Sequence, residues 1–401
     1  MRIAVYHNLP AGGAFRVVAE FLKAVCDPIE CTLFTLDGRG TALQQLEPPR
    51  PTEGIGDVTT VSAPVPPDRW STWAGRRAAG LDLLRGIRTA EGLVAERINE
   101  GEYDCALVHP SWATQAPWLL SQLRVPSVYY MHEVRRRTFE PGYSPSTLPR
   151  TFRAMPSRLV AAYVESQLVR GDKSAVRHAG ALACNSRYTA GSIHRHYGRT
   201  ATVCHPGVDM ELFHPHPELS RDALVLSVGG LEPFKGHHEV VAALARIPLR
   251  SRPRLGLVYE RCEPRYRTEL LDLASYVGVQ VEEHRAVSDQ SLAQLYSRAC
   301  ATVLAARLEP FGLVALESMA CGTPVVAVAE AGYLETVVPD LNGFLVDREP
   351  DAIARAIIGT LNGELGDEDA IRASVTHRWS WSSAAREVVR LLTRMAEERT
   401  S

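Results

Sequence analysis

The stretch TVLAARLEPFGLVALESMACGTP, residues 302–324, decides the fold predicted for this chain. Its apolar start predicts a buried strand over 302–305, and a loop then leads to a helix over about 311–320. Gly322 and Pro324 predict the end of that helix, because glycine suits a left-handed cap and proline cannot continue a helix. A strand followed so closely by a helix is typical of the units that build parallel sheets.

Two acids in this stretch, Glu309 and Glu317, stand eight positions apart. Eight residues of helix span at most ~12 Å, which is too far for two carboxylates to share a proton or a metal ion. The spacing also exceeds the ~5–9.5 Å between the paired carboxylates of glycosidases. It suits two hydroxyl-rich ends of one long ligand, with a phosphate held between them by the N–H groups of Gly312 and Leu313. The pattern predicts a sugar–pyrophosphate–ribose ligand, although each glutamate alone could be an ordinary solvated residue.

Length and composition indicate an enzyme-like globular protein. The 401 residues predict two domains, and 45% hydrophobic with 22% charged residues is ordinary for such proteins. A net charge of −2 gives no basis for nucleic acid as a general partner. The sequence has no apolar run long enough to span a membrane and no secretory signal in its first residues. The eight cysteines contain no C-x-x-C pair, so they predict reduced residues of a cytoplasmic protein.

The first half of the chain alternates strands and helices. A strand over 2–7, a turn containing Gly12 and Gly13, and a helix over 15–25 predict a phosphate-type nest. Asp37 after the next strand leaves open a dinucleotide site, but the G-x-G-x-x-G fingerprint is absent. Residues 44–67 predict a surface excursion with little regular structure. The alternation indicates a parallel doubly wound sheet, whose ligands bind at the carboxyl ends of strands.

Two features of the first half of the chain have ionisable side chains that could act in a site. His132 follows a strand over 125–131 and precedes Glu133, a position that suits either a catalytic or a structural histidine. Residues 134–178 contain nine Lys and Arg but three Asp and Glu, a net of +6. Such a run could be a solvated face or could meet an anionic acceptor.

A strand over 223–228 and the turn Gly229–Gly236 open the second half, and the turn carries Lys235. Only three of the 44 basic residues are lysine, so this lysine suggests that a compact ammonium charge is needed here. A glycine turn that brings one ammonium to the end of a sheet suits a pyrophosphate. An ordinary surface turn is the alternative.

From Glu309 onward, the opening stretch and the two residues after it read EPFGLVALESMACGTPVV (309–326). It resembles the donor-site motif of retaining GT-B glycosyltransferases, glycosyltransferase family 4 (glycosyl transferases group 1). The resemblance covers nearly the whole chain and is strongest over 225–347. It implies an α/β fold of two Rossmann-like, doubly wound parallel-sheet domains that face each other across a cleft. Residues 1–215, joined by a C-terminal helix at about 382–401, would form the acceptor-side domain, and 216–381 would bind the nucleotide-sugar donor.

The resemblance also implies residue roles. His132 would line the reacting centre, Lys235 would stabilise the departing diphosphate, and Glu309 would orient the sugar. The donor contacts implied are Gly12, Gly13, Gly230, Lys235, Arg285, Val287, Glu309, Phe311, Gly312, Leu313 and Glu317. Glu317 would hold the ribose, and backbone atoms of the loop over 284–287 would hold the nucleobase. The family has an arginine where this chain has Gly230, and Arg307 or Arg285 could supply that charge instead.

The implied reaction is transfer of a sugar from a UDP- or GDP-linked donor to an acceptor hydroxyl, with retention of anomeric configuration. We expect no metal ion or other cofactor, because no Cys or His spacing suits a metal site. The acceptor could be a cell-envelope lipid or glycan, reached at the inner face of an anionic membrane, or a natural-product or cyclitol core. Two alternatives stay open. A catalytically silent GT-B homologue could act as a binding subunit, and a nucleotide-dependent oxidoreductase could use the N-terminal glycine turn.

Overall fold

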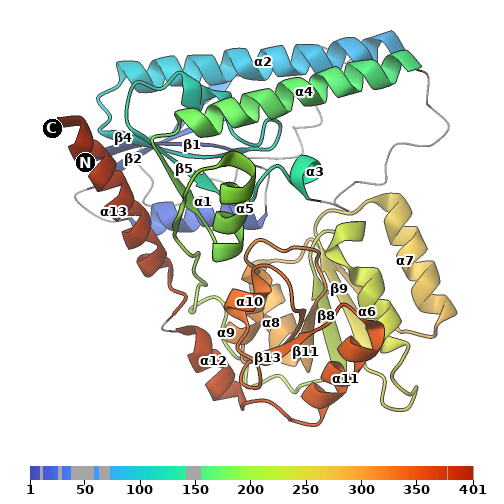
Figure 1. Cartoon of the computed structure of the whole chain (residues 1–401). Coiled ribbons are helices and arrows are strands. Elements are labelled where there is room, and N and C mark those ends of the chain that lie inside the picture. The colour runs from blue at the N-terminus through green and yellow to red at the C-terminus, as the bar shows by residue number, and fades with distance from the viewer. Residues whose placement is uncertain are drawn as a thin grey trace. The chain divides into compact units, whose positions relative to one another are not determined.

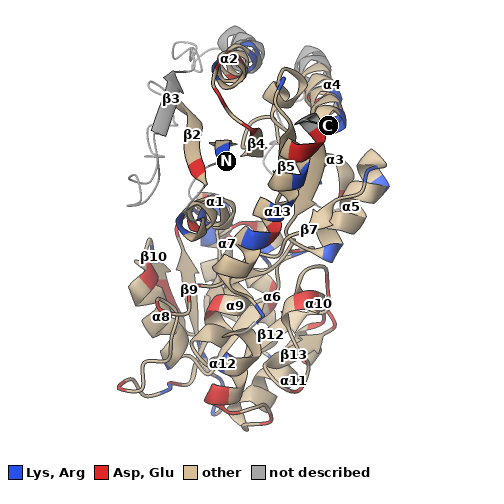
Figure 2. Cartoon of the chain, turned by 90° about the vertical axis from the view of Figure 1, so that its left-hand side faces the viewer, with Lys and Arg blue, Asp and Glu red and all other residues tan. Residues whose placement is uncertain are grey.

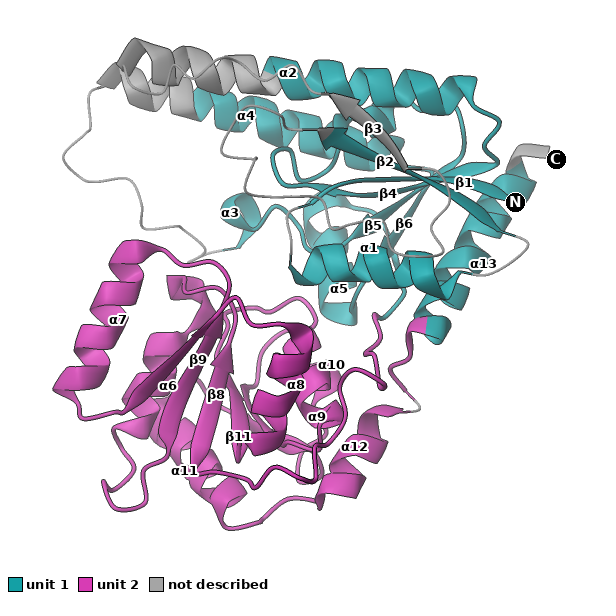
Figure 3. Ribbon diagram, turned by 180° about the vertical axis from the view of Figure 1, so that it is seen from behind, with its two compact units in different colours: residues 1–205, 382–401 teal, residues 206–381 magenta. Residues whose placement is uncertain are grey.

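The structure is a computed structural model that describes residues 1–9, 12–25, 29–37, 58–62, 73–140, 155–376 and 378–400. The chain forms two compact units, Met1–His205 with Ser382–Ser401, and Pro206–Trp381 (Figure 3). Residues 206–215, which the sequence-based boundary assigns to the first domain, lie in the second unit. There the Arg372 guanidinium donates to the carbonyls of Met210 and Phe213, which ties this segment to the second unit.

The first unit is built on a seven-stranded sheet with strand order β3-β2-β1-β4-β5-β6-β7. The strands are β1 (Arg2–Asn8), β2 (Glu30–Asp37), β3 (Val58–Ser62), β4 (Cys105–Ser111), β5 (Ser127–Met131), β6 (Ala181–Cys184) and β7 (Thr202–Val203). The helices are α1 (Gly13–Ala24), α2 (Trp73–Glu100), the short 3-10 helix η2 (Trp118–Ser121), α3 (Arg136–Phe139), α4 (Met155–His178), α5 (Arg187–Tyr197) and α13 (Trp381–Thr400). Helices α2 and α4 lie over one face of the sheet, and α1 and α5 lie over the other (Figure 1).

The second unit is built on a six-stranded sheet with strand order β10-β9-β8-β11-β12-β13. The strands are β8 (Leu224–Val228), β9 (Arg254–Tyr259), β10 (Val281–Arg285), β11 (Ala301–Leu304), β12 (Val325–Val328) and β13 (Gly343–Val346). The helices are the 3-10 helix η3 (Pro233–Lys235), α6 (His237–Leu244), α7 (Pro264–Tyr276), α8 (Asp289–Arg298), α9 (Leu313–Ala320), α10 (Tyr333–Thr336), α11 (Pro350–Leu361) and α12 (Glu368–Thr376). Helix α6 packs with α7 and α11, whereas α9 packs with α8 and α12.

Both sheets are parallel, and both contain the doubly wound strand order in which the chain starts at the centre and then reverses direction. In the second sheet the reversal falls between β8 and β11, which are hydrogen-bonded neighbours. Ligands of such sheets bind outside the carboxyl ends of the strands at this switch point. The topology therefore brings the loops after β8 and β11 together, although 76 positions separate Val228, the end of β8, from Leu304, the end of β11.

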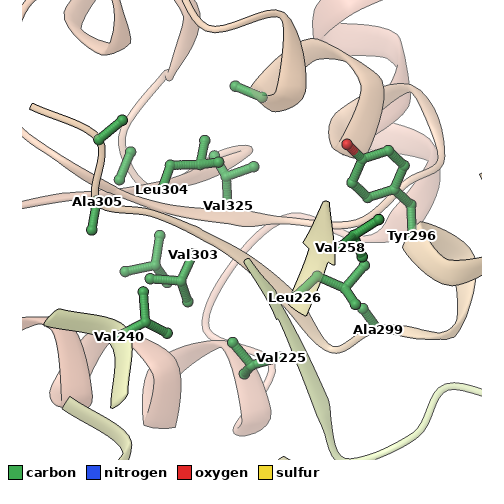
Figure 4. Close-up of a cluster of buried hydrophobic side chains, with 14 of the residues drawn as sticks. Val225, Leu226, Val240, Val258, Tyr296, Ala299, Val303, Leu304, Ala305 and Val325 are labelled. Carbon is green, nitrogen blue, oxygen red and sulfur yellow. The ribbon is translucent and has the colours of Figure 1, made fainter. Parts of the chain in front are cut away.

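The core of the second unit explains why its central strands can be predicted from apolar runs in the sequence. Buried side chains of β8 (Val225, Leu226), β11 (Val303, Leu304) and α8 (Tyr296) belong to one hydrophobic cluster, in which Val225 lies on the side of Val303 and Leu226 on the side of Tyr296 (Figure 4). Strands covered on both faces by helices are apolar along their whole length. Burying each such side chain contributes roughly 1.5–3 kcal/mol.

Two elements differ from the sequence-based prediction. Strand β3 (Val58–Ser62) lies inside the stretch predicted to have little regular structure, and it pairs in parallel with β2. Its sequence, VTTVS, is β-branched at four of five positions, which favours a strand despite the Pro and Gly residues around it. Helix α9 begins at Leu313 rather than near 311, because Gly312 adopts a left-handed φ of 98° and acts as the N-cap.

Candidate functional site

The turn after β8 brings Lys235 close to the loop after β11. Gly236 has a φ of 74°, and a Cβ atom placed there would lie 2.2 Å from the carbonyl oxygen of Ala305. Only glycine allows the two backbones to approach so closely. The Lys235 Nζ consequently donates to Glu309 Oε2 at 3.0 Å, so two residues predicted independently from the sequence form one ion pair.

The backbone around Glu309 is held in an uncommon conformation. Leu308 has a φ of 47°, which is rare for a residue other than glycine. The Arg307 N–H donates to the Phe234 carbonyl at 2.8 Å, and the Gly332 N–H donates to the Glu309 carbonyl at 2.8 Å. Strain of this kind persists only where neighbouring structure imposes it, and it concentrates at functional sites.

The start of α9 offers N–H groups beside this ion pair. Phe311, expected to begin the helix, instead packs edge-on against Trp379 with ring centroids 5.4 Å apart. Gly312 then turns the chain, and Leu313 is the first helical residue. The N–H groups at a helix start have no partners within the helix, and the helix dipole is positive there. This end of α9 can therefore bind an anion.

Glu317 lies one turn further along α9 and is buried, with 7% of its surface exposed. The hydroxyl of Tyr296, a fully buried residue of α8, donates to Glu317 Oε2 at 3.1 Å. This bond orients the Glu317 carboxylate, whose oxygens are hydrogen-bond acceptors. The sequence identifies Glu317 but not Tyr296, whose place beside it depends on the packing of α8 against α9.

Gly230 belongs to the same turn as Lys235, and a buried histidine fixes it. The His237 Nε2 donates to the Gly230 carbonyl at 3.0 Å, and its Nδ1 lies 2.8 Å from the Ser227 hydroxyl, which donates to it. Burial lowers the pKa of His237 to about 4, so the ring is neutral and can fill both roles. Arg307, one candidate for the missing charge, lies 3.3 Å from Glu239.

Arg285 and Val287 lie at a different place along the same edge of the sheet. Arg285 is the last residue of β10, and β9 separates that strand from β8. Between them Ala286 has a φ of 50° and donates its N–H to the Tyr259 carbonyl at 2.8 Å. The predicted donor residues of the second unit thus lie along the edge from β10 to β11, with the proposed nucleobase loop at one end and the Lys235–Glu309 pair at the other.

The close approach of the two loops can be tested with Gly236→Ala. Gly236 and Gly363 share a left-handed φ, 74° and 72°, but nothing lies within 4 Å of a Cβ at Gly363. Gly363→Ala should lower the free energy of unfolding by about 1 kcal/mol, because alanine disfavours the left-handed conformation. Gly236→Ala should lower it by about 1–3 kcal/mol more, because its Cβ would overpack against Ala305. Urea unfolding of both variants measures the difference. Equal losses would mean that the contact with Ala305 is unimportant.

In the first unit, Gly12 and His132 also lie at carboxyl ends of strands. Gly12 follows β1 with a φ of 143°, and Gly13 begins α1. His132 follows β5 and is buried, and its Nε2 lies 3.2 Å from the Nδ1 of His109. His109 lies near the end of β4, and His7 near the end of β1. The strand-end argument that selects His132 also applies to these two histidines, which the sequence-based prediction did not include.

The buried histidines predict a pH dependence of stability. Burial lowers the pKa of His7 to about 4 and that of His132 to about 3, so both stay neutral in the folded unit when the unfolded chain takes up protons below pH ~6.5. Their contribution to the free energy of unfolding is fully present above that pH. It is lost as pH falls towards 4, by up to ~1.4 kcal/mol per pH unit for each histidine. Glu91 and Asp172 act in the opposite direction, because burial raises their pKa values to about 7 and about 6.

Because of these opposing acids, the free energy of unfolding should be compared between the wild type and His132→Gln from pH 7.5 to 4.5. The wild type should lose stability relative to the variant as pH falls. Parallel curves would show that His132 is not held neutral.

Two arginines of the basic segment form buried ion pairs, whereas Arg137, Arg170, Lys173 and Arg177 are exposed. Arg135 binds Glu165 with Nε and Nη2 at 3.1 and 3.0 Å, and Arg136 binds Glu140. Both arginines are buried. Arg150 and Arg153 lie outside the described residues. Basic and acidic residues are interspersed along the described elements (Figure 2).

The described residues contain neither a metal-binding cluster nor a membrane-spanning helix. No group of three or more His, Cys, Asp or Glu within the described ranges could hold a metal ion. The sequence has one Asp-x-Asp triplet, at 367–369, where Asp367 accepts from the Ala370 N–H at the start of α12 and Glu368 binds Arg221. No described helix combines the length and apolar character needed to cross a bilayer.

Comparison with family models and sequences gives consistent matches over almost all of the chain. Residues 11–212 match the model described as Glycosyltransferase Family 4, and residues 209–377 match Glycosyl transferases group 1. The D-inositol 3-phosphate glycosyltransferase of Xylanimonas cellulosilytica is 30% identical over 315 residues, which cover 72% of this chain and 71% of the relative. The protein of the same name from Thermobispora bispora is 30% identical over 79% of this chain and 75% of the relative.

Solved structures match the whole fold. Sucrose-phosphate synthase from Thermosynechococcus elongatus has a TM-score of 0.77 at 21% identity, with 98% of each chain covered. Anabaena Alr3699/HepE in complex with UDP-glucose has a TM-score of 0.70 at 20% identity, with coverage of 98% of this chain and 100% of HepE. The GT-B fold expected from the resemblance, with two Rossmann-like sheets, is confirmed.

Proposed function

Since the chain belongs to glycosyltransferase family 4, we propose that it transfers a sugar from a UDP- or GDP-linked donor to an acceptor hydroxyl with retention of anomeric configuration. The observation that carries the proposal is the Lys235–Glu309 pair at 3.0 Å. It lies at the switch point between β8 and β11, where doubly wound sheets bind ligands. Beside it, the start of α9 at Leu313 offers N–H groups to an anion.

Lys235 and the start of α9 have a common role in this proposal. Sugar transfer leaves a nucleoside diphosphate, whose negative charge grows as the glycosidic bond breaks. Preorganised donors aimed at developing charge usually lower the barrier of such reactions more than any other single effect. The Lys235 ammonium has three N–H donors, so one can remain on Glu309 while others bind phosphate oxygens.

Glu309 is proposed to orient the sugar, and Glu317 the ribose. Glu309 already accepts a hydrogen bond from Lys235 and would accept a second one from a sugar hydroxyl. Because Lys235 would also bind the phosphate, the pair would fix the sugar relative to the diphosphate. Glu317, oriented by the Tyr296 hydroxyl, would accept from ribose hydroxyls. Backbone atoms of the loop over 284–287 would bind the nucleobase. In the first unit, His132 would line the reacting centre, and Gly12 with Gly13 would approach donor phosphate or acceptor.

The proposed reaction needs no metal ion, because Lys235 would take the place of a divalent cation at the diphosphate. The Asp-x-Asp triplet has a structural role at the start of α12, since Asp367 caps that helix and Glu368 binds Arg221. The residue pattern thus supports stabilisation of the leaving group by basic side chains. Gly230, which stands where the family has an arginine, has no side chain that could bind the leaving group.

For the acceptor, we favour a small hydroxylated core such as a cyclitol over a lipid in an anionic membrane. The relatives named D-inositol 3-phosphate glycosyltransferase take a cyclitol phosphate, as their name says. In the basic segment, which suggested an anionic surface, Arg135 and Arg136 are buried and paired with Glu165 and Glu140, so only Arg137, Arg170, Lys173 and Arg177 offer exposed charge among the side chains described. Buried, paired arginines contribute little attraction to a membrane.

A donor panel tests the proposed function. UDP-, GDP- and dTDP-sugars, with UDP-glucose first because HepE binds it, are screened for thermal stabilisation and for nucleotide release with cyclitols and with lipid acceptors. Stabilisation by a nucleotide-sugar with release in the presence of a cyclitol is expected. Stabilisation without release on any acceptor would indicate a silent binding subunit. A flavin or nicotinamide absorbance in the purified protein would indicate the oxidoreductase alternative.

A further inference from the structure

Arg348, just after β13, uses its whole guanidinium within the protein. Its Nε and Nη2 donate to the two carboxylate oxygens of Glu330 at 2.8 and 2.7 Å. Its Nη1 donates to Glu239 and to the Ala305 carbonyl, and Nη2 also donates to the Ala306 carbonyl at 3.2 Å. All five N–H donors of the side chain thus have acceptors. The side chain is 15% exposed, so the bonds are little weakened by water.

The partners of Arg348 belong to three segments around the candidate site. Glu239 lies in the first turn of α6, directly after the turn that carries Lys235. Ala305 and Ala306 begin the loop after β11 that leads to Glu309. Glu330 lies in the loop after β12. One side chain from the loop after β13 therefore connects the segments on both sides of the Lys235–Glu309 pair.

The strained residue before Glu309 depends on the same network. Leu308, with a φ of 47°, donates its N–H to Glu330 Oε2 at 3.3 Å. Arg348 binds this same oxygen and, by hydrogen bonding, keeps the pKa of Glu330 below its usual value, so the acceptor stays a carboxylate. The loop of Glu330 also contributes Gly332, whose N–H holds the Glu309 carbonyl at 2.8 Å.

The geometry points to Arg348 as a positioning residue that fixes the Lys235–Glu309 pair without touching substrate. This inference rests on the proposed function, since it assigns those two residues to the donor. Lys235 and Glu309 come from separate loops, and their usefulness depends on their separation. Reacting groups misplaced by about 1 Å lose on the order of 100-fold in rate, even when the change lies far from the chemistry.

Arg221 provides a matched control in the same unit. It also makes several bonds, to the carbonyls of Ala299 and Gly322, to the Thr323 hydroxyl and to Glu368. These partners lie at the amino ends of β11 and β12, at the opposite edge of the sheet. Arg221→Gln and Arg348→Gln should both lower the melting temperature, so stability alone does not separate a positioning role from a structural one.

Hydrogen exchange of the full-length variants, without ligand, separates the two roles. Arg348→Gln should speed exchange of the Leu308 and Gly332 amides by about tenfold or more, because their local opening becomes easier. Arg221→Gln should leave these amides unchanged. This readout does not depend on activity, so it tests the inference even if no donor is found. Unchanged exchange in Arg348→Gln, or equal acceleration in both variants, would overturn it.

Kinetics with UDP-glucose, measured as UDP release, then test the link to catalysis. Arg348→Gln should lower kcat roughly 10- to 100-fold with little change in KM. Arg348→Lys should recover melting temperature more than kcat, because an ammonium keeps the charge but lacks the planar fork that spans Glu330 and the backbone. A kcat loss in Arg221→Gln as large as in Arg348→Gln would contradict the inference. If the wild type does not release UDP, the choice of donor is wrong, and the exchange result stands by itself.

Discussion

Lys235→Ala should lower kcat by about 100-fold or more, which corresponds to ~2.7 kcal/mol of lost transition-state stabilisation. The ammonium is aimed at charge that develops only as the diphosphate leaves, so KM should change less than kcat. The substitution also leaves Glu309 without the cation that lies 3.0 Å away. Steady-state kinetics with the donor found in the panel measure both parameters.

Lys23→Ala is the matched control, because Lys23 also pairs with a glutamate, Glu20, at 2.8 Å but lies on the exposed face of α1. Its kcat should equal that of the wild type. Activity of the wild type should also survive EDTA, since Lys235 takes the role of a metal ion. Loss of turnover in EDTA that magnesium restores would contradict this role for Lys235.

The two acids should differ in which kinetic parameter they change. Glu309→Ala should lower kcat strongly, because it misplaces the reacting sugar and removes the partner of Lys235. Glu317→Ala should chiefly raise KM and weaken nucleotide binding, because a ribose contact is made equally in the ground and transition states. Replacing Glu317 should also remove its hydrogen bond with the buried Tyr296 hydroxyl and so lower stability.

Calorimetric titration with UDP and kinetics on both variants distinguish the roles. Tyr296→Phe serves as a control, since it removes the hydroxyl that orients Glu317 but keeps the carboxylate. It should show a weaker form of the Glu317→Ala effect. Equal, small changes of both parameters in Glu309→Ala and Glu317→Ala would rule out the division of labour between sugar and ribose.

Much of the second unit is predictable because its signals are local. The run over 302–324 contains a buried strand, a left-handed glycine and a helix in one continuous segment, and the structure differs mainly in starting the helix at Leu313. The rarity of lysine identifies Lys235, and helix spacing separates Glu309 from Glu317. Strand order then brings Lys235 and Glu309 together, and that order follows from repeated strand–helix alternation.

What the sequence does not predict depends on contacts between distant positions. Arg348 meets Glu239 across 109 positions, and neither residue belongs to a recognisable motif. The pairing of Arg135 with Glu165 is hidden in the same way, since composition gives a charge excess but not which charges meet. Strand β3 is not predicted because the Pro and Gly residues nearby outweigh its β-branched residues.

The anomeric configuration of the product tests the central claim most directly. The glycoside formed from UDP-glucose, or from whichever α-linked donor the panel identifies, is analysed by proton NMR of its anomeric position. Transfer with retention at the Lys235–Glu309 site predicts an α-glycoside from the wild type and almost none from Lys235→Ala. A β-glycoside would show inversion, and unchanged product formation by Lys235→Ala would place the reaction elsewhere; either result would contradict the proposed function.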